Sequence, residues 1–250
     1  MLLPKIDYSF WLKKNEYYSD EILSNSVEQG LNHAAKAGLV GKYIEHLKTN
    51  KDLINLIEEK IKQKKSPNDY SDKDLLTIFD LIQGWGGRTG RSPYVQPKGK
   101  PYRMNDDTYP KIYREAIEML YKTNKESEYD EILQVKPKIE ELKGVGESFS
   151  TKHLSFWSRF LDNCPPLAIF DKRMKNIFYA SNNSSNKEIT YKNFLKALQE
   201  TSKSINLEIY EIEAAIFGFS ENYFKNEEIV LINEFEIDHE DVRIAKELIS

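Results

Sequence analysis

The sequence contains few residues that could form covalent cross-links or bind a metal. Cys164 is the single cysteine in 250 residues, which excludes an internal disulfide, an iron–sulfur cluster held by cysteines and a cysteine-based zinc site. The four histidines are scattered without the spacing of metal ligands. We therefore expect neither a metal nor an organic cofactor.

Long apolar runs are also absent. No stretch approaches the roughly 18 apolar residues that a membrane span needs. The first residues, MLLPKIDYSFWLKK, lack the apolar core and the small-residue cleavage site of a signal peptide. A lone cysteine suits a reducing compartment. We expect a protein of the cytoplasm with no membrane contact.

The charge is unevenly distributed along the chain. The net charge of −4 argues against a nucleic-acid partner, but residues 221–250 alone hold nine acids and three bases. The other residues therefore carry a net charge of +2. Residues 84–103 contain five cations and no acid: Arg88, Arg91, Lys98, Lys100 and Arg103. Because phosphate binding depends on local charge, nucleic acid stays a candidate partner.

Helical periodicity dominates the sequence and predicts an all-α fold. Helices are expected over residues 19–36, 40–49, 51–64, 109–124, 130–142, 190–204 and 207–217. Ser71 and Asp74 resemble a capping box that opens a helix ending at Gly84. Five glycines and three prolines exclude a regular helix over residues 84–101. The tail, 221–250, is predicted to be an acidic helical segment, with a short strand as an alternative near 228–237.

The most informative segment is 142–174, LKGVGESFSTKHLSFWSRFLDNCPPLAIFDKRM. Its Gly144-Val145-Gly146 turn predicts a tight hairpin between two helices. The first backbone N–H groups of the second helix have no intrahelical acceptor and can bind a phosphate oxygen without reading base sequence. This pattern predicts a phosphate-binding hairpin.

Two side chains in the same segment have a plausible chemical role. Lys152 lies among Phe149, Phe156 and Trp157, which should lower its pKa and favour the nucleophilic amine. Asp171 follows 19 residues later, after an apolar run, at a position that suits a helix N-cap. A carboxylate there can also stabilise positive charge on a sugar or move a proton.

These features together resemble the helix-hairpin-helix DNA glycosylases, and within them the bacterial branch with the 8-oxoguanine DNA glycosylase (OGG) fold. The resemblance lies in GVGESFSTKHLSFW, in LAIFDKRM and, more weakly, in WGGR at 85–88. It implies one glycosylase domain over residues 1–250, with two helical lobes around a cleft. One lobe would carry the hairpin, Lys152 and Asp171, and the N-terminal helices and the end of the chain would form the other. Lys152 lies about one helical turn further from the glycines than in better-known members, on roughly the same helix face.

The resemblance also implies roles for individual residues. Lys152 would be the Schiff-base nucleophile, able to support AP-lyase strand cleavage, and Asp171 the essential carboxylate. Double-stranded DNA would be the partner, and a damaged base would be flipped out of it. The protein would be a monomer, associated with the bacterial nucleoid. The remaining expectations concern two groups of residues. Phosphate contacts are predicted at Gly144, Val145, Gly146, Lys172 and Arg173, and a base pocket or DNA-facing loop at Trp85, Arg88, Arg91, His153 and Phe156.

Other interpretations stay open on the sequence alone. Lys172 and Arg173 also suit a solvated helix face, His153 suits packing, and Trp85 suits a loop packed on the core. The whole chain could be a catalytically inactive DNA-binding module, in repair or phage defence. It could also be an interaction protein that uses residues 84–103, which we call the basic loop, to bind RNA or protein. Oxidised guanine is the default base of the family, and a phage-type modified base is an alternative.

Overall fold

The computed structural model describes residues 3–15, 22–95, 101–124, 129–182 and 189–223. These residues form helices and connecting segments, with no strand among them, so the predicted all-α class is confirmed. The predicted strand near 228–237, the tail from 224 onward, and Lys98 and Lys100 lie outside the described residues. No helix in the described part of the chain is both long enough and apolar enough to cross a membrane.

The chain divides into two compact units, Tyr17–Pro166 and Met1–Glu16 with Leu167–Ser250. We call the first the hairpin unit and the second the terminal unit. Lys152 belongs to the hairpin unit and Asp171 to the terminal unit. This division differs from the expectation that one lobe carries both residues, and it also places the N-terminal helices α2–α4 with the hairpin rather than with the end of the chain.

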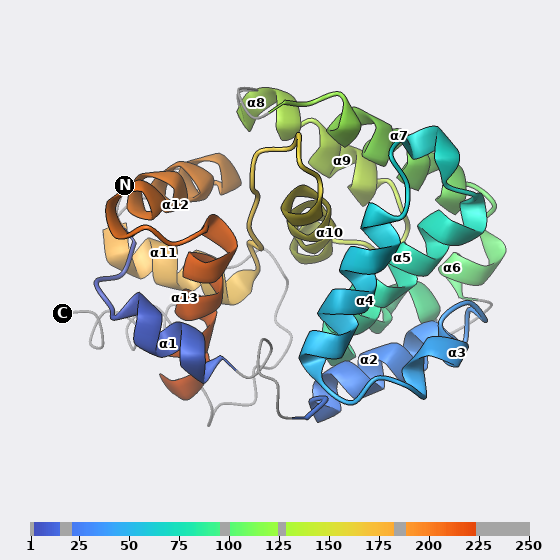
Figure 1. Ribbon diagram of the computed structural model, residues 1–250, viewed down its shortest axis with the longest axis horizontal. Helices are drawn as coiled ribbons and strands as arrows, with labels where there is room; N and C mark the ends of the chain where they lie inside the picture. Colours follow the sequence, from blue (N-terminus) through green and yellow to red (C-terminus); the bar gives the residue numbers. More distant parts are fainter. Residues whose placement is uncertain (1–2, 16–21, 96–100, 125–128, 183–188, 224–250) are drawn as a thin grey trace. The chain divides into compact units, whose positions relative to one another are not determined.

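The hairpin unit contains α2 to α10 and two 3-10 helices. The elements are α2 (Asn25–Ala35), α3 (Gly41–Ile44), α4 (Asn50–Lys62), η2 (Pro67–Asp69), α5 (Asp72–Trp85), η3 (Gly87–Tyr94), α6 (Tyr102–Asn105), α7 (Tyr109–Tyr121), α8 (Tyr129–Ile132), α9 (Val135–Glu140) and α10 (Glu147–Phe160). Helix α5 packs against α2, α4, α7, η3 and α10, so it forms the centre of this unit. Figure 1 shows α10 end-on beside α4, α5 and α9.

Helix α5 illustrates how local sequence sets the element boundaries. Its first turn carries the predicted capping box: Ser71 Oγ accepts from the Asp74 backbone N–H at 3.1 Å, and Asp74 Oδ2 accepts from the Ser71 backbone N–H at 3.0 Å. The helix ends at Trp85, followed by Gly87 with φ of +68°, a conformation that glycine adopts without strain. The segment after it is the 3-10 helix η3, in agreement with the predicted absence of a regular helix there.

Several predicted helices are shorter than expected. Helix α2 begins only at Asn25, where Ser24 caps it, and the region 40–49 holds a single helical turn, α3. The region 130–142 contains two short helices, α8 and α9, with Leu133 and Gln134 between them. Apolar periodicity continues through such turns because the chain still follows the core surface, so it overestimates helix length.

A buried ion pair anchors the basic loop to the centre of the hairpin unit. Arg103 donates from Nε and Nη2 to the two carboxylate oxygens of Asp80, at 2.9 Å each. Tyr94 donates its hydroxyl to Asp80 Oδ1 at 2.7 Å. Because Asp80 and Arg103 are both buried, the two oxygens need these donors. The network joins α5, η3 and α6 into one rigid support.

The terminal unit is built around α13 (Ile209–Tyr223), with α1 (Tyr8–Lys14), α11 (Lys172–Asn182) and α12 (Tyr191–Ile205) packed against it. Asn15 Nδ2 donates to the Ala214 carbonyl at 2.6 Å and thereby fixes the end of α1 to α13. The segment 167–170 is held by Phe170, whose ring stacks on Phe194 at 4.9 Å. The packing of Phe170 therefore fixes the backbone immediately before Asp171.

Candidate active site

The hairpin turn between α9 and α10 has the predicted geometry. Gly144 has φ of +86°, a conformation that favours glycine, and Val145 N–H donates to the Leu142 carbonyl at 3.0 Å. Tyr109 donates its hydroxyl to the Lys143 carbonyl, and the Val145 side chain is buried. Gly144 itself is exposed, so the turn presents its backbone to solvent while its neighbours anchor it.

Helix α10 begins without a side-chain cap. Gly146 is its N-cap residue and has no side chain to accept a hydrogen bond, while its carbonyl accepts from the Phe149 and Ser150 N–H groups. Helices usually satisfy their first N–H groups with a Ser, Thr, Asp or Asn cap, as Thr49 and Ser71 do here. The uncapped start of α10 therefore retains the capacity to bind an anion.

The hairpin turn packs against the basic loop. A Cβ atom added to Gly144 would lie 3.0 Å from the Ser92 carbonyl carbon and 3.0 Å from the Pro93 nitrogen. This close approach of two backbones explains why the turn has no side chain at position 144. It places η3, with the exposed Arg88 and Arg91, beside the hairpin.

Lys152 lies on α10, two turns after the uncapped start, and its side chain is only 7% exposed. Its Nζ donates to Ser148 Oγ at 3.0 Å and lies 4.6 Å from the centroid of the Phe149 ring. Phe149 in turn fills the space above two loop glycines, because a Cβ added to Gly86 or Gly90 would lie 2.2 Å or 3.1 Å from its ring. The amine is thus held on an aromatic face that the glycines of the basic loop make room for.

Two of the predicted pocket aromatics contact each other. The rings of Trp85 and Phe156 meet edge to face at 5.0 Å, and Phe156 lies one helical turn after Lys152. Both side chains are about 5% exposed or less. They line the interior next to α10 and do not form an exposed stacking platform.

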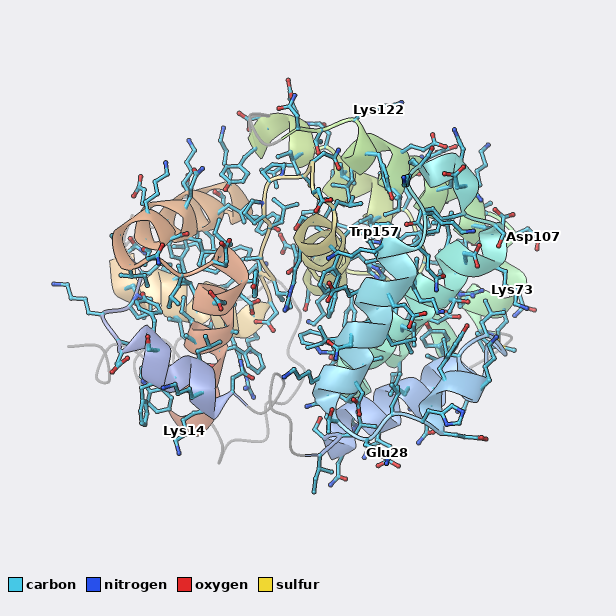
Figure 2. All side chains as sticks on the ribbon, in the orientation of Figure 1. Lys14, Glu28, Lys73, Asp107, Lys122 and Trp157 are labelled. Atoms are coloured by element: carbon cyan, nitrogen blue, oxygen red, sulfur yellow. The ribbon has the colours of Figure 1, made fainter. Side chains whose placement is uncertain are left out.

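His153 faces the interior of the hairpin unit. Its Nδ1 lies 2.8 Å from the Tyr113 hydroxyl, its Nε2 lies 3.2 Å from Gln83 Nε2, and its ring stacks on Phe79 at 4.8 Å. Trp157 Nε1 donates to the same Tyr113 hydroxyl at 2.7 Å. Figure 2 labels Trp157 on α10 within the packed interior. This chain of partners favours a structural role for His153.

Burial lowers the pKa of His153 to about 3, and the nearby charge of Lys152 contributes to the shift. Since the unfolded chain binds a proton at this residue near pH 6.5, the folded state should lose stability as the pH falls below that value. The expected loss is about 2 kcal/mol between pH 7 and pH 5. Urea unfolding at the two pH values measures it, and His153→Gln should remove this component. An unchanged pH dependence in the variant would contradict the assignment.

Asp171 lies at the start of α11 in the terminal unit. Its Oδ1 accepts from the Met174 backbone N–H at 3.1 Å, which confirms the predicted N-cap. Its side chain is half-buried, and no described residue donates to Oδ2. The N-cap bond through one oxygen therefore holds the carboxylate in place.

The two cations after Asp171 differ in their surroundings from a simple solvated face. The Arg173 guanidinium lies 5.4 Å from the Phe217 ring of α13, and both Lys172 and Arg173 are half-buried.

In the described part of the chain, no group of three or more His, Cys, Asp or Glu side chains is arranged to hold a metal ion.

Three residues of this region are not indicated by the sequence motif: Ser148, which contacts Lys152, and Gln83 and Tyr113, which contact His153. Ser148 is four residues before Lys152, a spacing that places two side chains on the same helix face, so it could have been found. Gln83 and Tyr113 come from α5 and α7 and reach His153 only through tertiary packing.

A family model described as "Putative 8-oxoguanine DNA glycosylase OGG-like protein" matches residues 54–217, a range that includes the basic loop, the hairpin, Lys152 and Asp171. No curated protein and no solved structure matches the chain. Because the match covers well over half of the sequence, the chain belongs to this OGG-like family of DNA glycosylase type.

Proposed function

We propose that the protein excises a damaged or modified base from duplex DNA, with Lys152 as the nucleophile and Asp171 as the assisting carboxylate. Oxidised guanine is the base to test first. The observation that carries the proposal is the environment of Lys152: a lysine 7% exposed, held by Ser148 and the Phe149 ring on the helix that follows the hairpin. Lysine side chains are rarely so buried unless a partner holds them, and burial favours the uncharged amine that nucleophilic catalysis needs.

The proposed chemistry begins with the neutral amine. Lys152 Nζ attacks C1′ of the deoxyribose, the N-glycosidic bond breaks, and its electron pair leaves with the base, which takes up a proton. The amine loses a proton and the sugar ring opens to give a Schiff base at C1′. Loss of a C2′ proton then expels the 3′ phosphate, and water hydrolyses the Schiff base to restore the lysine.

Asp171 would stabilise the positive charge that develops on the sugar as the base departs. Its Oδ1 is engaged by the Met174 N–H, while Oδ2 can face a substrate or accept the lysine proton. A carboxylate held by an N-cap bond has little rotational freedom, which favours such a role.

DNA would be held through its backbone. The hairpin residues Gly144, Val145 and Gly146 would bind one phosphate, chiefly through the Gly144 and Gly146 N–H groups, because the Val145 N–H already donates to the Leu142 carbonyl. Arg88 and Arg91 of η3 lie on the element that packs against this turn. Lys172 and Arg173 are proposed as further phosphate contacts. The target base would leave the stack and enter a pocket near Trp85 and Phe156, which requires some movement of these buried rings.

A screen of duplexes that each carry one modified base tests the proposal. We expect base release from at least one duplex by the wild type and none by Lys152→Gln. Binding of duplex DNA without release from any of them would instead indicate the inactive DNA-binding module.

Ser148 is proposed to position the Lys152 amine. Its hydroxyl lies 3.0 Å from Nζ, so Ser148→Ala should slow single-turnover excision about tenfold by removing this hydrogen bond. Ser148→Thr keeps the hydroxyl and should retain most of the wild-type rate. If Ser148 only fills space, Ser148→Thr, which adds a methyl group, should be no faster than Ser148→Ala. Equal rates for wild type and Ser148→Ala would rule out the positioning role.

A further inference from the structure

Helix α2 and the start of η3 approach each other at backbone distance. A Cβ atom added to Gly30 would lie 2.3 Å from the Gly84 carbonyl oxygen and 2.7 Å from that of Gly87. The Arg88 backbone N–H donates to Ser26 Oγ at 3.3 Å. The side chains that follow on this face of α2 therefore lie beside the basic loop.

Three basic side chains lie on the two elements that pack together at this junction. His33 is three residues after Gly30, on the same face of α2, and Lys36 Nζ lies 3.5 Å from His33 Nδ1. Partial burial lowers the pKa of His33, and the nearby positive charges of Lys36 and Arg91 lower it further. Arg91 lies on η3, which packs against α2.

The group consists almost entirely of hydrogen-bond donors. Lysine and arginine have no acceptor, and the Nδ1 acceptor of His33 already faces Lys36. No acidic side chain among the described residues forms an ion pair with Lys36 or Arg91, and both are exposed. Like charges gathered without an acid repel one another, so an anion bound between them would relieve this cost.

The cluster lies close to the hairpin. Arg91 directly precedes Ser92, whose carbonyl carbon lies against Gly144 at the turn. Arg91 can therefore reach a phosphate next to the one bound at the turn. An open, solvated cluster binds a free phosphate only weakly. A strand already held at the hairpin would present its next phosphate at high effective concentration.

We propose that His33, Lys36 and Arg91 form a second phosphate-binding site for the DNA backbone, next to the hairpin turn. The inference rests on the proposed function, because it takes duplex DNA as the ligand. It extends that function by assigning helix α2 to the DNA-binding surface. Since the contacts are to the backbone, the site should increase affinity for all sequences equally.

The test measures duplex binding in a protein that cannot turn over its substrate. In the Lys152→Gln background, Lys36→Gln with Arg91→Gln should weaken binding about tenfold and reduce the slope of log affinity against log salt by about one to two. Arg91→Lys keeps the charge and should preserve the slope. The wild-type background, assayed for base release, reports separately on the proposed function.

A matched control removes the same charge elsewhere in the hairpin unit. Lys73 and Lys122 are exposed, and Figure 2 labels them at the periphery. Lys73 lies in the first turn of α5, the end far from η3, and Lys122 follows the end of α7 that is far from the hairpin. Lys73→Gln with Lys122→Gln should leave the salt slope near that of the parent.

The outcomes separate the two proposals. A reduced salt slope in the variant that lacks Lys36 and Arg91, with an unchanged slope in the control variant, supports the site. Base release by the wild type, combined with an unchanged slope in that variant or an equal reduction in the control, overturns the site and leaves the proposed function standing. Absence of both binding and base release overturns the proposed function, and the site with it.

Discussion

Replacing Lys152 with glutamine should abolish the covalent complex that borohydride traps between the protein and duplex DNA carrying its target base. Glutamine is similar in length, so it can still lie on the Phe149 ring and contact Ser148. It has no amine, so no Schiff base can form. We expect base excision to fall on the order of 10³-fold or more. Trapping followed by gel electrophoresis, together with single-turnover excision, measures both effects.

The control for this prediction is Lys111→Gln, which removes an exposed lysine of α7 in the same unit. It should trap as well as the wild type, and both variants should bind the duplex. If Lys152→Gln still traps, another amine is the nucleophile. If excision persists without any trapping in the wild type, the protein uses water rather than Lys152, and the strand-cleavage proposal fails while base excision stands.

The helices around the site could be predicted because their signals are local. The capping box at Ser71 and Asp74, the glycine turn before α10 and the N-cap at Asp171 each depend on residues within one turn of each other. Helix length was predicted less well. The apolar pattern extends past α3 and α8, whereas the backbone hydrogen bonds of those helices end after one turn.

The surroundings of Trp85 depend on tertiary packing. A tryptophan before a glycine-rich basic loop suits a stacking platform for a base, but it is also the last residue of α5, and its ring packs against Phe156. The glycines after it have a similar explanation, because Gly86 and Gly90 leave space for Phe149. Composition alone cannot distinguish a glycine that lies beside DNA from one that lies beside a phenylalanine.

The surroundings of Lys152 could also be predicted only in part from the sequence. Its helix and its aromatic neighbour Phe149 could be predicted from spacing. The division of the chain could not, because the boundary at Pro166 and Leu167 falls within the motif that links Lys152 to Asp171. A motif continuous in sequence thus contributes its two chemical groups from two compact units, and each group is held by its own unit: Lys152 by Ser148 and Asp171 by the first turn of α11.

This separation allows the catalytic role of Asp171 to be tested apart from its capping role. Asparagine is as good an N-cap as aspartate, so Asp171→Asn should keep the hydrogen bond from the Met174 N–H and change the free energy of unfolding by less than about 0.5 kcal/mol. The negative charge is lost, however, and excision should fall about 10³-fold because the developing charge on the sugar is no longer stabilised. Urea unfolding and single-turnover excision measure the two effects.

The control is the cap of a neighbouring helix in the same unit. Thr190 Oγ1 accepts from the Asn193 N–H at 3.2 Å, so Thr190→Ala should cost about 1 kcal/mol of stability and leave the excision rate unchanged. A fall in rate with Asp171→Asn but not with Thr190→Ala would identify the carboxylate charge as the cause. Wild-type excision by Asp171→Asn would instead mean that Asp171 only caps α11, and the positive charge on the sugar would have to be stabilised by another group.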